Sequence, residues 1–275
     1  MYNFMRNLLK DHENGVFVFK AFSIAHIVYL VLIIGAIVGT IFYLRNKSDD
    51  KKKKVINLCV NIALGLYIAD FFLMPFSEAG IDIDKLPFHI CTLMSIMCFL
   101  ARHTKFFSKY KTTFTLMGLI GALMYLTYPS GVPSADGYSY RIVQTVLYHG
   151  LMIAQGVFAI AFGDLDLRWK SIKYDLVAIV AMALWAFIGN TLYSGVVEEV
   201  CEIGGGLTHT IKVYDHDFNW FFVKHDALYI FDDNIDVYFA PFAMIAVIFG
   251  MSALIRLISI KLFKAPSAVV DEATE

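Results

Sequence analysis

The stretch AFSIAHIVYLVLIIGAIVGTIFYL, residues 21–44, decides the fold class of this chain. Its 24 residues contain no Asp, Glu, Lys or Arg, and about 20 consecutive apolar residues are enough to cross a bilayer core as a helix. The stretch begins too late and runs too long for a cleaved signal peptide. We therefore interpret it as a transmembrane helix.

The composition extends this interpretation to the whole chain. Of the 275 residues, 58% are hydrophobic and 17% are charged, against roughly half and a quarter in soluble globular proteins. The 24 Phe and 15 Tyr add more apolar surface than one water-soluble core could cover. A net charge of −1 does not indicate nucleic-acid binding, so we expect no nucleic-acid partner. The four Cys lack the spacing of zinc ligands, and we expect no metal and no cofactor.

Seven segments have the composition of membrane-spanning helices. None alternates with the period of two that is typical of strands, and helices satisfy their own backbone groups in lipid. The third and fourth segments are the shortest. The expected spans are residues 21–44, 55–76, 86–101, 112–128, 141–162, 174–194 and 237–262. The sequence thus predicts one all-α transmembrane domain over residues 1–275, a polytopic membrane protein of seven helices.

Basic residues indicate how these spans are oriented. Sixteen of the 23 Lys and Arg residues fall in loops 45–54, 102–111 and 163–173 or near the C-terminal end. Since basic loops remain in the cytoplasm, the N-terminus is predicted outside and the C-terminus inside. Seven spans also require the termini to lie on opposite sides. The loop 195–236 is long and acidic, and it is predicted to be extracytoplasmic.

Polar side chains inside the spans are costly in lipid and are candidates for function. At about 1.5 Å of rise per residue, five of them lie at one depth in the outer leaflet. They are His26, Asp70, Cys91, His149 and Asn190. The inner half offers mainly Asn57 and Asn61, with Gln155 near the centre. We therefore expect one outward-facing polar site.

Helical spacing indicates which groups can meet Cys91. His89 lies two residues away and cannot face Cys91 on a regular helix, so a base has to come from another helix, with His149 or His26 at suitable depth. A position near a helix N-terminus would favour a thiolate. The alternative is that Cys91 only packs, as most Cys in apolar helices do.

The fifth span carries a polar face. Arg141, Gln144 and Tyr148 follow at i, i+3 and i+7, and His149 lies beside them. Arg141 at the outer interface suits a phosphate as a bidentate donor, or its long side chain only snorkels to the interface. Asp70 would be structural if it paired with a His or with Arg141.

The stretch Leu86–Cys91, LPFHIC, resembles the LPLHLC signature of the YwaF-type bacterial integral membrane proteins, which are related to eukaryotic transmembrane protein 164. Further similar motifs follow in order, and the resemblance covers residues 20–195 and the last span. It is absent from 195–236. The further motifs are FSIAH at 22–26, GLIG at 118–121, Tyr128-Pro129, RIVQ at 141–144, His149-Gly150 and Asn190.

The eukaryotic relative is regarded as a phospholipid acyltransferase that uses the Cys of the matching motif. The resemblance therefore implies that Cys91 attacks an ester of a glycerophospholipid, with His149 or else His26 as base and His89 nearby. It implies membrane phospholipids as partners, no cofactor, and a place in the cell membrane. The expected substrate-binding residues are Arg141, Gln144, Tyr148, Asp70 and Asn190.

Two other functions fit the same sequence. A transporter or lipid-binding protein would use the outer polar pocket without covalent chemistry. An interaction protein would meet a partner through the loop 195–236. The lack of a duplicated half and of a charge relay in the inner leaflet argues against transport.

Overall fold

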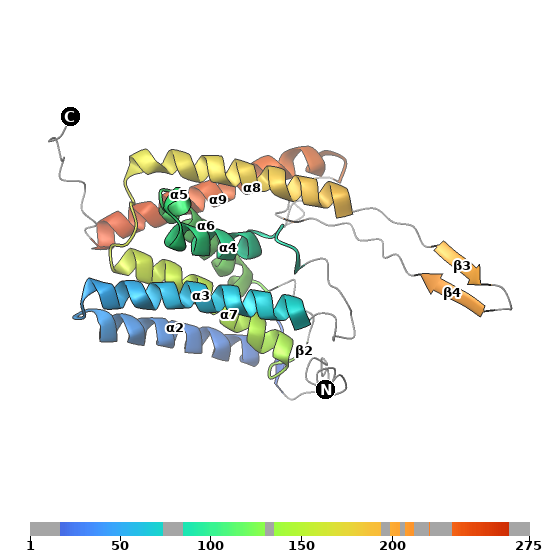
Figure 1. Cartoon of the computed structure of the whole chain (residues 1–275), viewed down its shortest axis with the longest axis horizontal. Coiled ribbons are helices and arrows are strands. Elements are labelled where there is room, and N and C mark those ends of the chain that lie inside the picture. Colours follow the sequence, from blue (N-terminus) through green and yellow to red (C-terminus); the bar gives the residue numbers. More distant parts are fainter. Residues whose placement is uncertain are drawn as a thin grey trace.

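A computed structural model of the chain describes residues 17–73, 85–129, 135–193, 199–203, 207–211, 220 and 233–263. Over these residues the molecule is a bundle of helices that run along one common direction (Figure 1). The short strands β1 and β2 pair in antiparallel fashion, Val18–Phe19 with Ala135–Asp136. The helices are α2 (Ile24–Leu44), α3 (Asp49–Leu73), α4 (Ile90–His103), α5 (Lys105–Ser108), α6 (Lys111–Thr127), α7 (Tyr140–Ala161), α8 (Ile172–Tyr193) and α9 (Asp233–Phe263).

Among the described residues, five helices are long and apolar enough to cross a membrane. They are α2, α3, α7, α9 and α8, the last together with the 3₁₀ turn that precedes it. Large apolar side chains on these helices face outward, among them Leu32, Leu184 and Phe242, as contact with lipid requires. The all-α, multi-pass class is thus confirmed. Each of the seven predicted spans contains a helix, but α4 has only 14 residues and α6 only 17.

The short helix α6 forms the centre of the bundle. Helices α4, α6 and α7 lie between α2 and α3 on one side and α8 and α9 on the other (Figure 1). Residues 112–122 of α6 are buried without interruption. Small residues permit this close packing, because a Cβ atom at Gly118 would lie 2.8 Å from Cε of Met152. A helix enclosed by protein has no lipid face, which explains its modest length.

Three helix boundaries differ from the expected spans. Helix α3 begins at Asp49, so the lysines of 51–54 lie on its first turns, where Asp49 and Asp50 suit the positive helix end. Helix α4 begins only at Ile90, with His89 as N-cap, because residues 86–89 form a separate turn. Helix α9 begins at Asp233 and takes up the last residues of the expected loop.

The segment 195–236 is partly regular rather than a simple loop. Strands β3 (Glu199–Ile203) and β4 (Leu207–Ile211) form an antiparallel pair that projects beyond the helices (Figure 1). Trp220 is the other described residue of its middle part, and it is 1% exposed. The rest of this segment before Asp233 lies outside the described residues.

Candidate functional site

Cys91 is the second residue of α4 and lies in its first turn. Its side chain is 8% exposed, and Sγ would lie 3.1 Å from a Cβ atom at Gly121 of α6. Its carbonyl oxygen accepts a 2.8 Å hydrogen bond from the hydroxyl of Tyr148. The N-cap residue His89 makes no side-chain cap bond. The backbone N–H groups of the first turn are therefore not capped by that side chain.

His149 of α7 presents one nitrogen that can act as a base. Nδ1 lies 2.8 Å from the carbonyl oxygen of Thr145, and because a carbonyl only accepts, Nδ1 carries the proton of the neutral ring. Nε2 then keeps its lone pair, and it has no hydrogen-bond partner among the described residues. The ring is 6% exposed. This protonation pattern is the one that a general base needs.

Tyr125 of α6 packs on His149. Its ring stacks on the imidazole with centroids 3.8 Å apart and planes 8° apart. Its hydroxyl accepts a 3.3 Å hydrogen bond from Oγ1 of Thr145. Sequence analysis missed Tyr125. The available signal was its i+4 spacing from Gly121, which puts both residues on the face of α6 that packs against Cys91.

Asp70 pairs with Lys85, a partner that the sequence did not suggest. Nζ of Lys85 lies 2.5 Å from Oδ2 of Asp70, and the Tyr67 hydroxyl donates to the carbonyl oxygen of Lys85 at 2.9 Å. These contacts tie the C-terminal end of α3 to the turn that leads into α4.

The polar face of α7 is divided among several neighbours. Gln144 donates to the carbonyl oxygen of Leu66 on α3 at 3.4 Å, while Tyr148 bonds α4 as described above. Both side chains are buried. Arg141 is half-buried at the start of α7. Gln144 and Tyr148 thus join helices, and Arg141 stays closest to the bundle end.

His26 uses both ring nitrogens in the fold. Nδ1 accepts a 3.0 Å hydrogen bond from the backbone N–H of Phe22, and Nε2 donates to the carbonyl oxygen of Leu126 at 2.7 Å. The side chain is 1% exposed. It fastens the start of α2 to the end of α6, and no nitrogen remains to take a proton from a thiol.

Asn190 holds the backbone of the long connecting segment. Its Oδ1 accepts from the N–H of Trp220 at 2.8 Å, and its Nδ2 donates to the carbonyl oxygen of the same residue at 3.2 Å. The Trp220 ring stacks on Phe88 at 4.7 Å and meets His89 edge-on at 6.2 Å. Part of the segment 195–236 therefore covers the turn that precedes Cys91.

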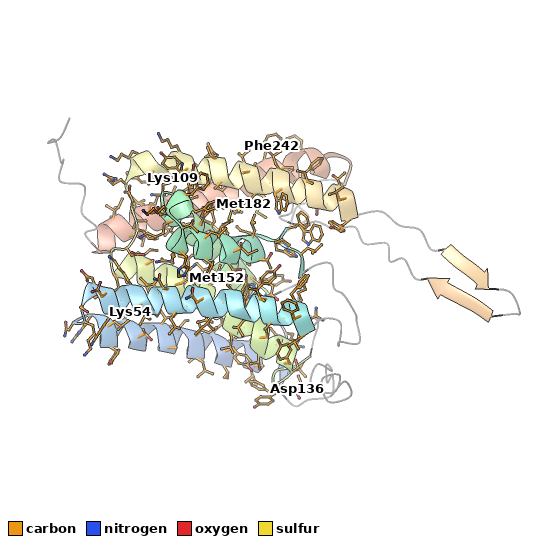
Figure 2. All side chains as sticks on the ribbon, in the orientation of Figure 1. Lys54, Lys109, Asp136, Met152, Met182 and Phe242 are labelled. Carbon is orange, nitrogen blue, oxygen red and sulfur yellow. The ribbon has the colours of Figure 1, made fainter. Side chains whose placement is uncertain are left out.

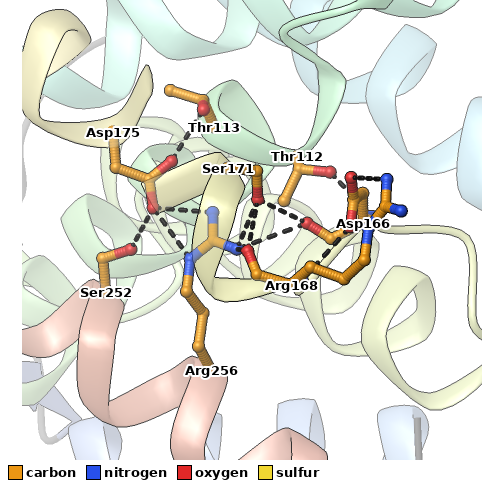
Figure 3. Close-up of polar contacts among 8 residues, drawn as sticks. All are labelled: Thr112, Thr113, Asp166, Arg168, Ser171, Asp175, Ser252 and Arg256. Atoms are coloured by element: carbon orange, nitrogen blue, oxygen red, sulfur yellow. Dashed lines mark hydrogen bonds and ion pairs between the residues drawn. The ribbon is translucent and has the colours of Figure 1, made fainter. Parts of the chain in front are cut away.

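A second buried polar cluster lies at the opposite end of the bundle, where the sequence analysis expected basic loops but named no buried charge. Asp175 and Arg256 are both fully buried and lie 2.8 Å apart. Ser252 and Thr113 each donate to Asp175 at 2.6 Å, and Arg256 also bonds Ser171 and two carbonyl oxygens (Figure 3). The side chain of Arg256 is thereby fully engaged.

A further buried ion pair accompanies this cluster. Arg102 lies 2.9 Å from Asp164, which also pairs with Lys111 at 2.9 Å. These buried ion pairs were missed by the sequence analysis, which expected mainly Asn57 and Asn61 as polar groups in the inner half of the spans. Arg102 and Arg256 were assigned to basic ends or loops by position, but the helices that carry them turn these side chains inward.

The described residues contain no group of three His, Cys, Asp or Glu side chains that could hold a metal ion. A family model, the TMEM164 family, matches residues 21–262 of the chain. This range includes every residue of the site described above. No curated protein and no solved structure matches the chain.

Proposed function

The chain belongs to the TMEM164 family, and we propose that it is a membrane-embedded acyltransferase that moves acyl chains between glycerophospholipids through a thioester on Cys91. The observation that carries this proposal is the grouping of Cys91, Tyr125 and His149. The thiol lies in the first turn of α4 and packs against Gly121 of α6. Four residues later on α6, Tyr125 stacks on the imidazole whose Nε2 is unprotonated.

The proposed reaction has two steps. In the first, Nε2 of His149 takes the thiol proton while Sγ of Cys91 attacks the ester carbonyl carbon of a phospholipid. The carbon–oxygen bond breaks, the thioester forms, and the leaving hydroxyl group of the lysolipid regains the proton from His149. In the second, the hydroxyl of another lysolipid attacks the thioester, and the thiol of Cys91 is restored.

The remaining residues support this chemistry in distinct ways. The N–H groups of the first turn of α4 are suited to stabilise the oxyanion that forms on the ester carbonyl. Arg141, on the same helix as His149, is proposed to contact the lipid phosphate. His89, Asp70, Gln144, Tyr148 and Asn190 shape and fasten the site. His26 takes a structural role, since both of its nitrogens are engaged.

We also propose that the seven helices other than the short α5 cross the cell membrane as one domain, with the N-terminus outside and the C-terminus inside. Lys54 and Lys109 lie at one end of the bundle, and Asp136 lies at the other (Figure 2). The basic end would face the cytoplasm. Cys91 and the hairpin of β3 and β4 would then belong to the outer side.

Labelling with an acyl-mimicking thiol probe tests the proposed chemistry. The protein is reconstituted in lipid, labelled and mapped by peptide analysis, with Cys59, Cys98 and Cys201 as internal controls. We expect selective labelling of Cys91 that is lost in His149→Ala. Labelling of all four cysteines alike, or of none, would contradict the role of Cys91 as the nucleophile. The outer pocket would then be one for transport or binding without covalent chemistry.

A further inference from the structure

An apolar groove lies between the outer end of α3 and the turn before α4. Its volume is about 300 Å³, and its walls are Tyr67, Ile68, Phe71 and Phe72 of α3 and Leu86 and Pro87 of the turn. Several of these side chains are exposed, with Ile68 at 44% and Phe72 at 71%. The groove is thus open on the outside of the bundle.

The two walls of the groove are held together by polar contacts along one edge. The hydroxyl of Tyr67 bonds the carbonyl oxygen of Lys85, and Lys85 pairs with Asp70. The Lys85 side chain is 25% exposed. An ammonium group has three N–H donors, so Nζ can hold Asp70 and still donate to a second acceptor. The walls of the groove are therefore apolar, and the ammonium group of Lys85, ion-paired with Asp70, belongs to the residue that directly precedes the wall residue Leu86.

One wall of this groove belongs to the turn that leads into α4, the helix that carries Cys91. Leu86 and Pro87 form one of its walls and lie in the same turn as His89, the N-cap of α4. Oγ1 of Thr92 donates to the carbonyl oxygens of His89 at 3.0 Å and of Leu86 at 3.5 Å. These bonds fix the groove wall to the first turn of α4, which contains Cys91.

We propose that the groove holds an acyl chain of a bilayer phospholipid, with its phosphate at Lys85, and so brings the ester toward Cys91. This inference rests on the proposed acyl transfer and names how its substrate is bound. One wall lies on α3, a helix long and apolar enough to span a membrane, where hydrocarbon chains are the surrounding solvent. An apolar groove next to an ammonium group with N–H donors to spare matches a molecule with an apolar chain and a phosphate in its head group.

Photo-crosslinking in lipid nanodiscs tests the groove. The probe is phosphatidylcholine with a diazirine near the end of one acyl chain, and unlabelled phosphatidylcholine competes. The full chain carries Cys91→Ser, so that crosslinking does not depend on chemistry. We expect saturable crosslinks in peptides that contain residues 67–72 and 86–87.

Two tryptophan variants make the test specific. Ile68→Trp fills the groove from an exposed position, and Leu32→Trp is the matched control on α2, at 61% exposure. Ile68→Trp should raise the half-saturating lipid concentration about tenfold, while Leu32→Trp should leave it unchanged. Crosslinks that rise linearly with probe and mark α2 and α3 alike would overturn the groove as a binding site.

Transfer activity of the protein with Cys91 intact separates the two proposals. Acyl transfer without saturable crosslinks would remove the groove and keep the acyltransferase. Saturable crosslinks at residues 67–72 without any transfer would overturn the proposed chemistry and leave a lipid-binding site.

Discussion

The two polar clusters of this bundle differ in how completely their groups are paired. At the basic end, both carboxylate oxygens of Asp175 and all three nitrogens of Arg256 have partners. At the other end, Tyr148, Thr145 and Tyr125 are bonded around Cys91 and His149, but Nε2 of His149 has no partner among the described residues. A fully paired cluster fastens helices, whereas a cluster with an available lone pair is suited to chemistry.

The largest expected effect comes from breaking the paired cluster. Arg256→Met leaves the carboxylate of Asp175 buried without its cation, which should lower the free energy of unfolding by about 3–5 kcal/mol. Chemical denaturation in mild detergent measures it. The folded fraction should keep its full transfer activity per molecule, because no atom of this cluster takes part in the proposed reaction.

A double variant provides the control for that prediction. Asp175→Leu combined with Arg256→Met removes both charges and should recover most of the lost stability, since apolar replacement of a buried pair is often neutral. Transfer activity that falls further than the folded fraction in either variant would contradict a purely structural role of the cluster around Asp175 and Arg256. That cluster would then take part in function.

The next effect concerns the stacking of Tyr125 on His149. Tyr125→Leu removes the ring that fixes the imidazole, and misplacement of a catalytic group costs on the order of 10²-fold in rate. Tyr125→Phe keeps the ring and should retain most of the activity. Steady-state transfer between labelled lipids measures both variants. Equal activity of the Leu and Phe variants would mean that the stacking does not position His149.

A smaller effect is expected at Asn190, which binds the backbone of Trp220 in the segment between α8 and α9. Asn190→Ala leaves the backbone N–H and carbonyl of Trp220 without these partners, at a cost of about 2 kcal/mol. Since Trp220 packs on Phe88 and His89, proteolysis of the segment should become faster while the helices stay protected. Asn190→Asp keeps only the acceptor and should give an intermediate rate. Unchanged proteolysis in Asn190→Ala would show that the hydrogen bonds of Asn190 to Trp220 do not hold the segment.

The smallest effect concerns the turn between α7 and α8. Hydrogen bonds from the Arg168 guanidinium at 2.7 Å lower the pKa of the Asp166 carboxyl below its ordinary value of 3.8. The stabilisation is therefore present above that value and is lost as pH falls through the lower pKa of the folded state. Both side chains are 41% exposed, so the change is small.

The variant Asp166→Asn isolates this contribution. The melting temperature of the unmodified chain should exceed that of the variant at neutral pH, and the difference should disappear as the pH falls well below 3.8. A difference that persists in strong acid would assign it to the hydrogen bonds of the turn rather than to the charge of Asp166.

Several parts of the site could be predicted from single residues. Cys91 and His149 were recognisable because polar atoms are rare in apolar helices, and their equal depth follows from the rise per residue. The spacing of His89 and Cys91 already required a base from another helix. The partners were not predictable. Asp70 meets Lys85 rather than a histidine or Arg141, and His26 bonds Leu126 at 2.7 Å, because those contacts depend on how turns lie across the ends of distant helices.

By itself, the sequence determined that this chain is a bundle of apolar helices, since runs of uncharged residues in lipid can satisfy their backbone groups only as helices. It also determined the face that carries Gln144 and Tyr148, because helical periodicity is local. Tertiary structure alone decided that Tyr125 stacks on His149 and that Asp175 meets Arg256, which is 81 residues away in the chain. Such pairs depend on which helices pack side by side, and periodicity within one helix does not specify its neighbours.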